Sequence, residues 1–241
     1  MKIIAISDLH GLLPEITERA DVMFLCGDIS PLNIQFNIPE MTIWMYKQFI
    51  PWIKTLNVEQ VYLIAGNHDA WFQRLSTPQR HELYYNGQGK LVYLKNESAS
   101  YIDNNGKEWT IFGTPYCHLF GNWPFMVSDE VLVEKFANIP NDVDFILSHD
   151  TPYGVGTQDY ILEKLRHGNH ELVHIGNSPL RDRLESINYK WLFHGHIHSS
   201  GHTPEEFVTG KVVNVSLVDE SYDLVYKPFI LTIEEDGTEI Y

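Results

Sequence analysis

Residues of the types that bind transition metals recur in five short polar blocks along this sequence. Imidazole and carboxylate donors together suit zinc, manganese or iron, whereas calcium sites are built mostly from oxygen and structural zinc sites usually contain cysteine. The sequence has only two cysteines, and neither is well spaced for a zinc site. The blocks therefore predict a transition-metal centre with the candidate ligands Asp8, His10, Asp28, Asn67, His149, His196 and His198.

These candidate ligands are too many for one four-coordinate ion that keeps an open position. Two ions that share one bridging carboxylate would use them all. The spacing within two blocks supports convergence, because side chains two residues apart on an extended segment point to the same side. Asp8 and His10 have this spacing, and so do His196 and His198. The donor set thus predicts a pair of ions.

Each polar block directly follows a short apolar run of the sequence. The runs are unbroken and do not alternate with polar residues, which is typical of strands buried on both faces. In an open α/β sheet the carboxyl ends of the strands form the ligand crevice, so we expect the blocks to converge in space. The predicted strands are residues 3–6, 22–25, 61–65, 145–147 and 191–193.

Helical patterns lie between these strands and imply an α/β layered fold. The longest predicted helix covers residues 40–57, with Pro51 as the expected site of a kink. A second covers residues 128–138, with Ser128 as its N-cap, and a third begins at Ser178, directly before a proline.

Further β segments do not fit this alternation. Turn residues near them predict two antiparallel pairings, of residues 91–94 with 109–112 and of residues 211–218 with 229–234. Residues 154–177 are expected to form a long loop around a short helical piece at residues 159–166. We find no internal repeat and no linker, so we expect a single domain over residues 1–241.

The composition is that of an acidic globular protein. Of the 241 residues, 44% are hydrophobic, which is enough for a sizeable core. The 32 acidic and 17 basic residues give a formal charge of −15, which disfavours long nucleic acids and membranes as partners. Cys26 and Cys117 cannot build a disulfide framework, and the N-terminal apolar stretch is too short for a signal sequence or a membrane span. We therefore expect a cytoplasmic protein.

In this order, the five blocks resemble the calcineurin-like metallophosphoesterase superfamily, whose pattern reads D-x-H, G-D, G-N-H-D or G-N-H-E, a lone histidine after a strand, and G-H-x-H. The likeness spans about residues 1–218. It implies an α/β (α+β) fold, a four-layer sandwich of two central mixed β-sheets flanked by helices. The matching blocks are Asp8-Leu9-His10, Gly27-Asp28, Gly66-Asn67-His68-Asp69, Ser148-His149 and Gly195-His196-Ile197-His198.

The resemblance also implies a distribution of the ligands between two divalent or mixed-valence ions of manganese, iron, zinc or nickel. One ion takes Asp8, His10 and His198; the other takes Asn67, His149 and His196; and Asp28 bridges them. The expected oligomeric state stays open.

The resemblance places two further residues in the chemistry. His68 is not a ligand but faces the phosphate, where it steadies charge and protonates the leaving oxygen, and Asp69 orients that imidazole and favours its charged form. Two ions about 4 Å apart activate a water or hydroxide between them for in-line attack on phosphorus. The predicted function is therefore hydrolysis of small phosphate esters, with a phosphodiester or a small phosphorylated molecule as the substrate.

The sequence departs from the protein Ser/Thr phosphatases of the superfamily. Its second block continues as Ile29-Ser30-Pro31, without the acid and arginine of those enzymes, and Asp69 stands where they carry glutamate. Protein phosphatase activity is therefore disfavoured. Three other segments resemble the metallophosphoesterase-domain-containing (MPPED-type) branch, which includes phosphodiesterases: Phe112-Gly113-Thr114-Pro115-Tyr116, Trp123-Pro124-Phe125 and Asn214-Val215-Ser216.

Two alternative functions stay open. A DNA or RNA exonuclease of the same superfamily should have clustered lysine and arginine around the crevice, and such residues are sparse here. A non-catalytic metal-binding scaffold should have lost a ligand or the His68-Asp69 pair, and the sequence retains both.

Several other residues have a functional and a structural interpretation. His118 could reach the crevice, or it packs at the surface. Trp71 and Phe72 could stack on an aromatic leaving group or nucleobase, or they simply pack in their loop. A second histidine cluster could bind metal or line the substrate entrance, but a glycine and an asparagine break its helix, so exposed loop residues are the better interpretation; it comprises His167, His170 and His174.

Overall fold

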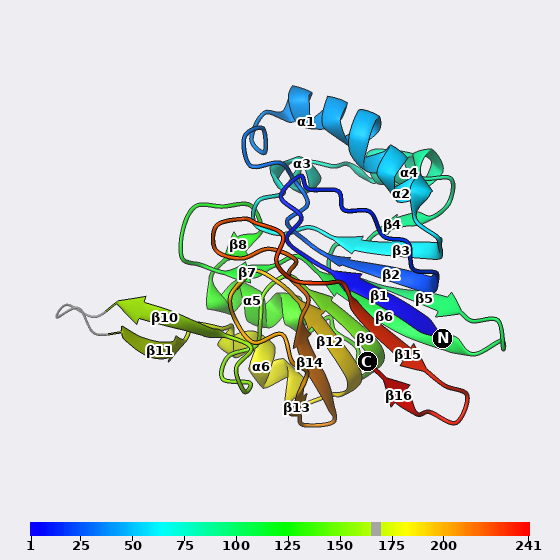
Figure 1. Cartoon of the computed structure of the whole chain (residues 1–241). Coiled ribbons are helices and arrows are strands. Elements are labelled where there is room, and N and C mark those ends of the chain that lie inside the picture. Colours follow the sequence, from blue (N-terminus) through cyan, green and yellow to red (C-terminus); the bar gives the residue numbers. More distant parts are fainter. Residues whose placement is uncertain (165–169) are drawn as a thin grey trace.

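Two six-stranded mixed β-sheets lie at the centre of the molecule (Figure 1). The structure is a computed structural model that describes residues 1–164 and 170–241. The first sheet contains β16 (Glu239–Ile240), β15 (Phe229–Ile233), β1 (Lys2–Ile6), β2 (Ala20–Cys26), β3 (Val58–Ile64) and β4 (Leu91–Tyr93), in that order. The second contains β13 (Glu205–Phe207), β14 (Gly210–Asn214), β12 (Asn188–His194), β9 (Asp142–Ser148), β6 (Glu108–Thr114) and β5 (Glu97–Ile102).

Each sheet has four neighbouring parallel strands, with antiparallel strands at one edge of the first sheet and at both edges of the second. In the first sheet β1, β2, β3 and β4 are parallel, and β15 pairs antiparallel with β1. In the second sheet β6, β9, β12 and β14 are parallel, while β5 and β13 are antiparallel to their neighbours. The parallel strands of each sheet therefore end at one common edge.

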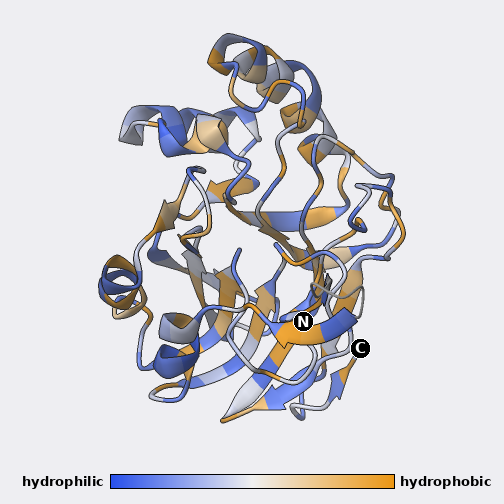
Figure 2. Cartoon of the chain, turned by 90° about the vertical axis from the view of Figure 1, so that its left-hand side faces the viewer, coloured by the Kyte–Doolittle hydropathy of each residue, from blue (hydrophilic) through white to orange (hydrophobic). Residues whose placement is uncertain are grey.

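The two sheets pack face to face through an aromatic core. Phe24 of the first sheet contacts Phe145 and Phe193 of the second, with ring centroids 5.6 and 5.3 Å apart. In β1 alternate side chains serve different layers, since Ile3 faces this core and Ile4 faces the helices. Figure 2 shows hydrophobic residues along the strands and hydrophilic residues over much of the covering helices.

Helices cover the two outer faces of the sheet pair (Figure 1). Over the first sheet lie α1 (Ile38–Trp44), η1 (Met45–Phe49), α2 (Ile50–Thr55), α3 (Ala70–Gln73) and α4 (Thr77–Asn86), and over the second lie α5 (Asp129–Phe136) and α6 (Ser178–Leu184). The expected sandwich of two mixed sheets flanked by helices is confirmed.

The long helix predicted over residues 40–57 is present but divided. A π-helical turn, η1, joins α1 to α2, and the Ile50 N–H donates to the Met45 carbonyl five residues back. Pro51 follows directly, in the first turn of α2, where its missing N–H needs no partner. The proline thus shifts the hydrogen-bonding pattern and does not break the helix.

Both predicted antiparallel pairings are wrong. Residues 91–94 contribute β4, which lies parallel to β3, while β6 forms its hairpin with β5. Strands β14 and β15 belong to different sheets, since β15 pairs with β1 and β16. Turn residues indicated that the chain reverses, but only tertiary packing selects the partner of each strand.

The prediction of a helical piece at residues 159–166 is also wrong for residues 160–164, the strand that the structure describes there. β10 (Tyr160–Lys164) pairs antiparallel with β11 (His170–His174) and projects from the body of the molecule (Figure 1). Cross-strand pairs such as Leu162 with Leu172 give these residues a sheet partner that local periodicity cannot reveal.

A second two-stranded sheet pairs β7 (Cys117–His118) with β8 (Met126–Val127).

Within the part of the chain that the structure describes, we find no helix with the length and apolar character that a bilayer crossing requires.

Candidate metal centre

The polar blocks that follow five strands meet at the carboxyl edges of the two sheets. The two edges are joined directly, because the Ser7 N–H donates to the Val215 carbonyl (2.8 Å) and the Leu217 N–H donates to the Ser7 carbonyl (3.1 Å). Residues that lie 188 positions apart in the sequence, such as His10 and His198, are therefore neighbours in space. The convergence expected from the strand ends is present.

One group of candidate ligands comes from the first and last blocks. Asp8, His10 and His198 present donor atoms that all lie within 4.8 Å of one another. His198 Nε2 is 3.5 Å from Asp8 Oδ1 and 3.3 Å from His10 Nε2. All three side chains are buried or nearly so. The family resemblance implied that these residues share one ion, and the fold brings them together.

The second group is built around His149. Its Nε2 lies 3.0 Å from Asn67 Oδ1 and 3.2 Å from Asp28 Oδ2. The His196 ring packs against the His149 ring, with centroids 5.1 Å apart. The four residues that the resemblance assigned to the other ion, with the bridge included, are thus neighbours.

Asp28 lies between the two groups. The same oxygen, Oδ2, is 3.2 Å from His149 Nε2 in one group and 4.0 Å from His10 Nε2 in the other. Its second oxygen, Oδ1, accepts a hydrogen bond from the His68 N–H at 2.7 Å. Among the described residues, the salt-bridge partners of this fully buried carboxylate are all histidines.

Two buried carboxylates keep their charge through neighbouring imidazoles. Burial by itself raises the pKa of Asp8, but the adjacent His198 lowers it below the usual range. Burial likewise raises the pKa of Asp28, and His149 reverses the effect. In return Asp28 raises the pKa of His149 to about 10, and Asp8 raises that of His198 to about 9, against the opposing effect of burial.

The other two histidines among the candidate ligands, His10 and His196, have neutral imidazoles. Burial lowers the pKa of His10 and of His196 to about 4, in spite of nearby carboxylates. Neutral imidazole and ionised carboxylate are the forms that coordinate a metal. In the protein without metal, the protons on the other two imidazoles balance the buried negative charge that cations would otherwise neutralise.

The donor set fits bound transition-metal ions. His10 Nδ1 is buried without a hydrogen-bond partner among the described residues, and its Nε2 faces another ring nitrogen, His198 Nε2, at 3.3 Å. Two facing imidazole nitrogens beside a buried carboxylate are costly unless a cation or shared proton lies with them. Nitrogen and oxygen donors in this mixture suit zinc, manganese or iron.

Backbone carbonyls fix the orientation of two of the histidines. His149 Nδ1 donates to the Cys26 carbonyl at 2.8 Å, and His198 Nδ1 donates to the Asp219 carbonyl at 3.0 Å. Each bond turns the opposite nitrogen, Nε2, toward the carboxylates. Such outer contacts hold metal-binding histidines in one orientation and tautomer.

The blocks are held in an unusual backbone conformation. Asp8, His10, Asp28 and His196 have φ values of 56°, 44°, 53° and 71°, in the left-handed region that residues with a Cβ seldom adopt. Each such residue costs on the order of 1–3 kcal/mol, and such strain gathers at functional sites. Four candidate ligands share this strained conformation, which indicates that the surrounding structure holds them in place.

A glycine in the last block allows the two sheets to approach. A Cβ on Gly195 would overlap Asp8 Oδ2 and Ser7 Oγ. We expect Gly195→Ala to displace Asp8 and to lower metal affinity roughly 10- to 100-fold, the scale for disturbed ligand support. Metal content after dialysis at a buffered metal concentration measures this loss.

Gly106→Ala is the control, because nothing lies within 4 Å of a Cβ added there. Its φ of +80° adds a backbone strain that Gly195 does not have, so this variant sets an upper limit on the general cost of replacing glycine. Metal binding that is equal in the two variants would contradict the close approach of the sheets.

The predicted pairing of the two candidate catalytic residues is wrong. Asp69 does not contact the His68 imidazole; its carboxylate accepts hydrogen bonds from the Ser30 N–H and hydroxyl (3.0 and 2.5 Å) and from the Gly66 N–H (2.8 Å). Burial raises the pKa of Asp69 to about 6. Through these hydrogen bonds Asp69 connects the second block, which contains Asp28 and is followed by Ser30, to the third block, which begins at Gly66. The His68 ring is held instead by Gln35, whose Oε1 lies 2.7 Å from His68 Nδ1.

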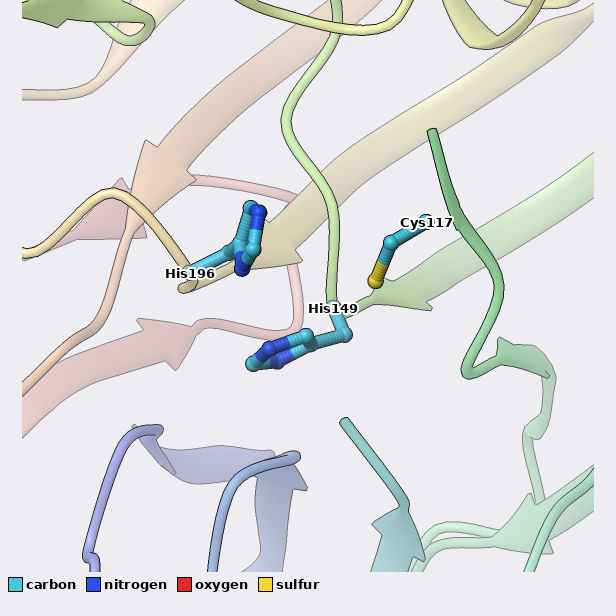
Figure 3. A group of neighbouring side chains, drawn as sticks. All are labelled: Cys117, His149 and His196. Carbon is cyan, nitrogen blue, oxygen red and sulfur yellow. The ribbon is translucent and has the colours of Figure 1, made fainter. Parts of the chain in front are cut away.

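One cysteine lies beside the second ligand group. The side chains of Cys117, His149 and His196 turn toward one another (Figure 3), and their candidate donor atoms lie within 4.8 Å of each other. Cys117 was not among the predicted ligands, because it has no ligand spacing to any block. Burial raises the pKa of its thiol well above the usual range, so it stays neutral and packs against the ligands.

Another missed residue is Asp150, directly after His149. Its Oδ2 accepts hydrogen bonds from the His118 N–H and from Asn177 Nδ2, and lies 2.8 Å from His118 Nδ1. The His118 ring lies 6.1 Å from that of His196 by centroid distance. His118 therefore reaches the edge of the centre, as one of its two interpretations proposed. The block Ser148-His149-Asp150 was the available signal.

The other candidates lie elsewhere. Trp71 and Phe72 are buried, and the Trp71 Nε1–H donates to Thr42 Oγ1 at 2.8 Å, so the stacking hypothesis is wrong for both. His174 pairs with Asp159 at 2.7 Å on the β10–β11 hairpin. Within the described ranges, no group of potential metal ligands includes His170 or His174. The third member of that cluster, His167, lies outside the described residues.

Comparisons with known proteins agree with this geometry. The family model "Calcineurin-like phosphoesterase" matches residues 1–200. Human metallophosphoesterase domain-containing protein 1 is 25% identical over 96% of this chain and 71% of its own length. An uncharacterized protein of Methanocaldococcus jannaschii is 26% identical over 83% of this chain and 81% of its own. A solved crystal structure with 16% identity shares the fold, with a TM-score of 0.59 over 88% of this chain and 89% of that chain.

Proposed function

Because this chain belongs to the calcineurin-like phosphoesterase family and is a metal-dependent phosphoester hydrolase, we propose that it works with two metal ions and acts on small phosphodiesters. The position of Asp28 is the observation that carries the proposal. One of its oxygens faces a histidine of each ligand group, at 3.2 and 4.0 Å. A carboxylate so placed is the natural shared ligand of two ions.

In this proposal Asp28 binds both ions and the other six ligands divide as the resemblance implied. Ions of manganese, iron, zinc or nickel held by these residues would supply a water of lowered pKa and would neutralise charge on the phosphate. Both sheets contribute ligands, which supports a single catalytic domain over residues 1–241. The two groups are as follows: Asp8, His10 and His198 in one, and Asn67, His149 and His196 in the other.

His68 is the proposed proton donor. Its ring is nearly buried and lies beside the centre, with Nε2 3.9 Å from Asp28 Oδ2. The Gln35 carbonyl oxygen accepts the proton of Nδ1, so Nε2 is the nitrogen left to face a substrate. A proton held there can be transferred to the departing alkoxide.

The test is a reconstitution series. Protein stripped of metal should be inactive, and restoring manganese, iron, zinc or nickel should return turnover as two ions bind per chain. The substrates are para-nitrophenyl phosphate and bis-para-nitrophenyl phosphate, and we expect the higher kcat/KM for the diester. Full activity with one ion per chain would contradict the dinuclear centre. A higher kcat/KM for the monoester would contradict the diester preference.

A further inference from the structure

Three aromatic side chains pack against the histidines of the metal centre, two from the loop between β7 and β8 and one from the loop between β14 and β15. The Trp123 ring lies 4.6 Å from the His68 ring by centroid distance, and the Phe120 ring lies 5.4 Å from the His196 ring. Tyr222 stands edge-on to His10 at 4.8 Å and to His198 at 5.3 Å. We call Phe120, Trp123 and Tyr222 the aromatic collar.

The collar is exposed although it is apolar. Phe120 is 58% and Tyr222 is 37% exposed, and Trp123 is partly buried beneath Phe36, itself 58% exposed. Buried aromatic residues of this protein pack in the layers between sheets and helices, and these do not. Phe120 and Tyr222 therefore each have one side against the centre and another open to solvent, an arrangement suited to a flat ligand group. Trp123 lies between His68 and Phe36 and is partly exposed.

The loops around the centre contain no cationic side chain. The chain segments that follow the strand ends and carry the ligands and the collar have neither lysine nor arginine. They are residues 7–18, 27–37, 65–73, 114–134, 148–163, 194–210 and 214–226. Among described residues, Asp8 and Asp28 form salt bridges with histidines alone. These segments therefore offer a polyanionic substrate no lysine or arginine contact of their own. Two lysines from neighbouring segments, Lys95 and Lys135, lie over the Phe125 and Tyr116 rings.

From these two observations we propose that the collar selects phosphodiesters with a single negative charge that carry a flat aromatic group, by stacking of that group on Phe120 or Trp123. The proposal rests on the proposed function and names its substrate class. Stacking on an aromatic side chain contributes about 1–3 kcal/mol per ring, which corresponds to roughly 5- to 150-fold in affinity. This gain replaces the affinity that arginine contacts give in sites for polyanions.

Competitive inhibition measures the effect without a change of leaving group. Diphenyl phosphate and diethyl phosphate have the same charge, and each is added against bis-para-nitrophenyl phosphate with metal-loaded protein. We expect the inhibition constant of diphenyl phosphate to be at least about tenfold lower. Dicyclohexyl phosphate separates stacking from bulk, since its rings are apolar but not flat, and it should inhibit more weakly than diphenyl phosphate.

The collar variants Phe120→Leu and Trp123→Leu should each reduce the ratio of the two inhibition constants at least threefold, and Trp123→Phe should restore most of it. Tyr85→Leu, at a 75% exposed aromatic residue of α4, is the matched control and should leave the ratio unchanged. A merely structural role would lower metal content and turnover while the ratio stays at the wild-type value, and that result would overturn the proposal.

The two proposals fail in different ways. If no ion restores hydrolysis of any diester, the proposed function fails, and calorimetric binding of diphenyl and diethyl phosphate to the metal-loaded protein still tests the collar. If wild-type protein hydrolyses diesters but binds both inhibitors equally, the collar proposal fails and the proposed function stands.

Discussion

Asp28→Asn is expected to leave the fold intact but to empty the centre, with fewer than one tightly held ion per chain and turnover about a thousandfold lower. The variant keeps the shape of the side chain and its acceptor oxygen for the His68 N–H. It removes the one anion that faces both ligand groups, at 3.2 and 4.0 Å. Ion-assisted catalysis contributes several kcal/mol, and about 4 kcal/mol corresponds to a thousandfold.

Metal analysis after desalting and kinetics on bis-para-nitrophenyl phosphate measure both effects. Asp236→Asn is the matched control, because that carboxylate is exposed and accepts a hydrogen bond in a turn, which asparagine can also accept. It should keep metal and turnover. Two tightly held ions in Asp28→Asn would contradict the bridging role.

His68→Ala is expected to separate metal binding from turnover. The side chain belongs to neither ligand group, so two ions should remain bound. Loss of a positioned proton donor lowers turnover by roughly a hundredfold or more. The effect should be largest for diesters with a poorly leaving alcohol, since para-nitrophenolate departs without much help from an acid. Metal and activity lost in equal proportion in His68→Ala would refute the assignment of a proton donor.

Gln35→Ala tests how His68 is held. The Gln35 side chain contacts the His68 ring at 2.7 Å and takes no part in the ligand groups. Its loss should therefore lower turnover less than His68→Ala does, and it should alter the pH profile of turnover.

Many residues of the centre could be predicted from the sequence, because each one lies close in sequence to the end of a recognisable strand. Each strand is a short apolar run, and each ligand follows within a few residues of the strand's end, as His149 follows β9. Parallel strands of one sheet end at one edge, so residues that are distant in sequence are predictably near in space. The family pattern then distributed them between two ions. The candidate ligands could therefore be proposed without coordinates.

The support around the ligands could not be predicted in this way. Gln35 holds His68, and Asp69 ties two blocks together, because of how the loop after β2 folds over the third block. No pattern of sequence spacing predicts either contact. The same is true of Cys117 and of the aromatic collar, whose members come from loops with no periodicity.

The sequence by itself determined which side chains gather at the strand ends, because burial pattern and chain connectivity decide that a strand's last residue is at the edge of its sheet. Only the tertiary structure decided what surrounds them: which sheet receives β4 and β15, which side chain orients His68, and which aromatic rings border the centre. The reason is that these outcomes depend on the packing of one loop or sheet against another, a contact between segments that no local pattern encodes.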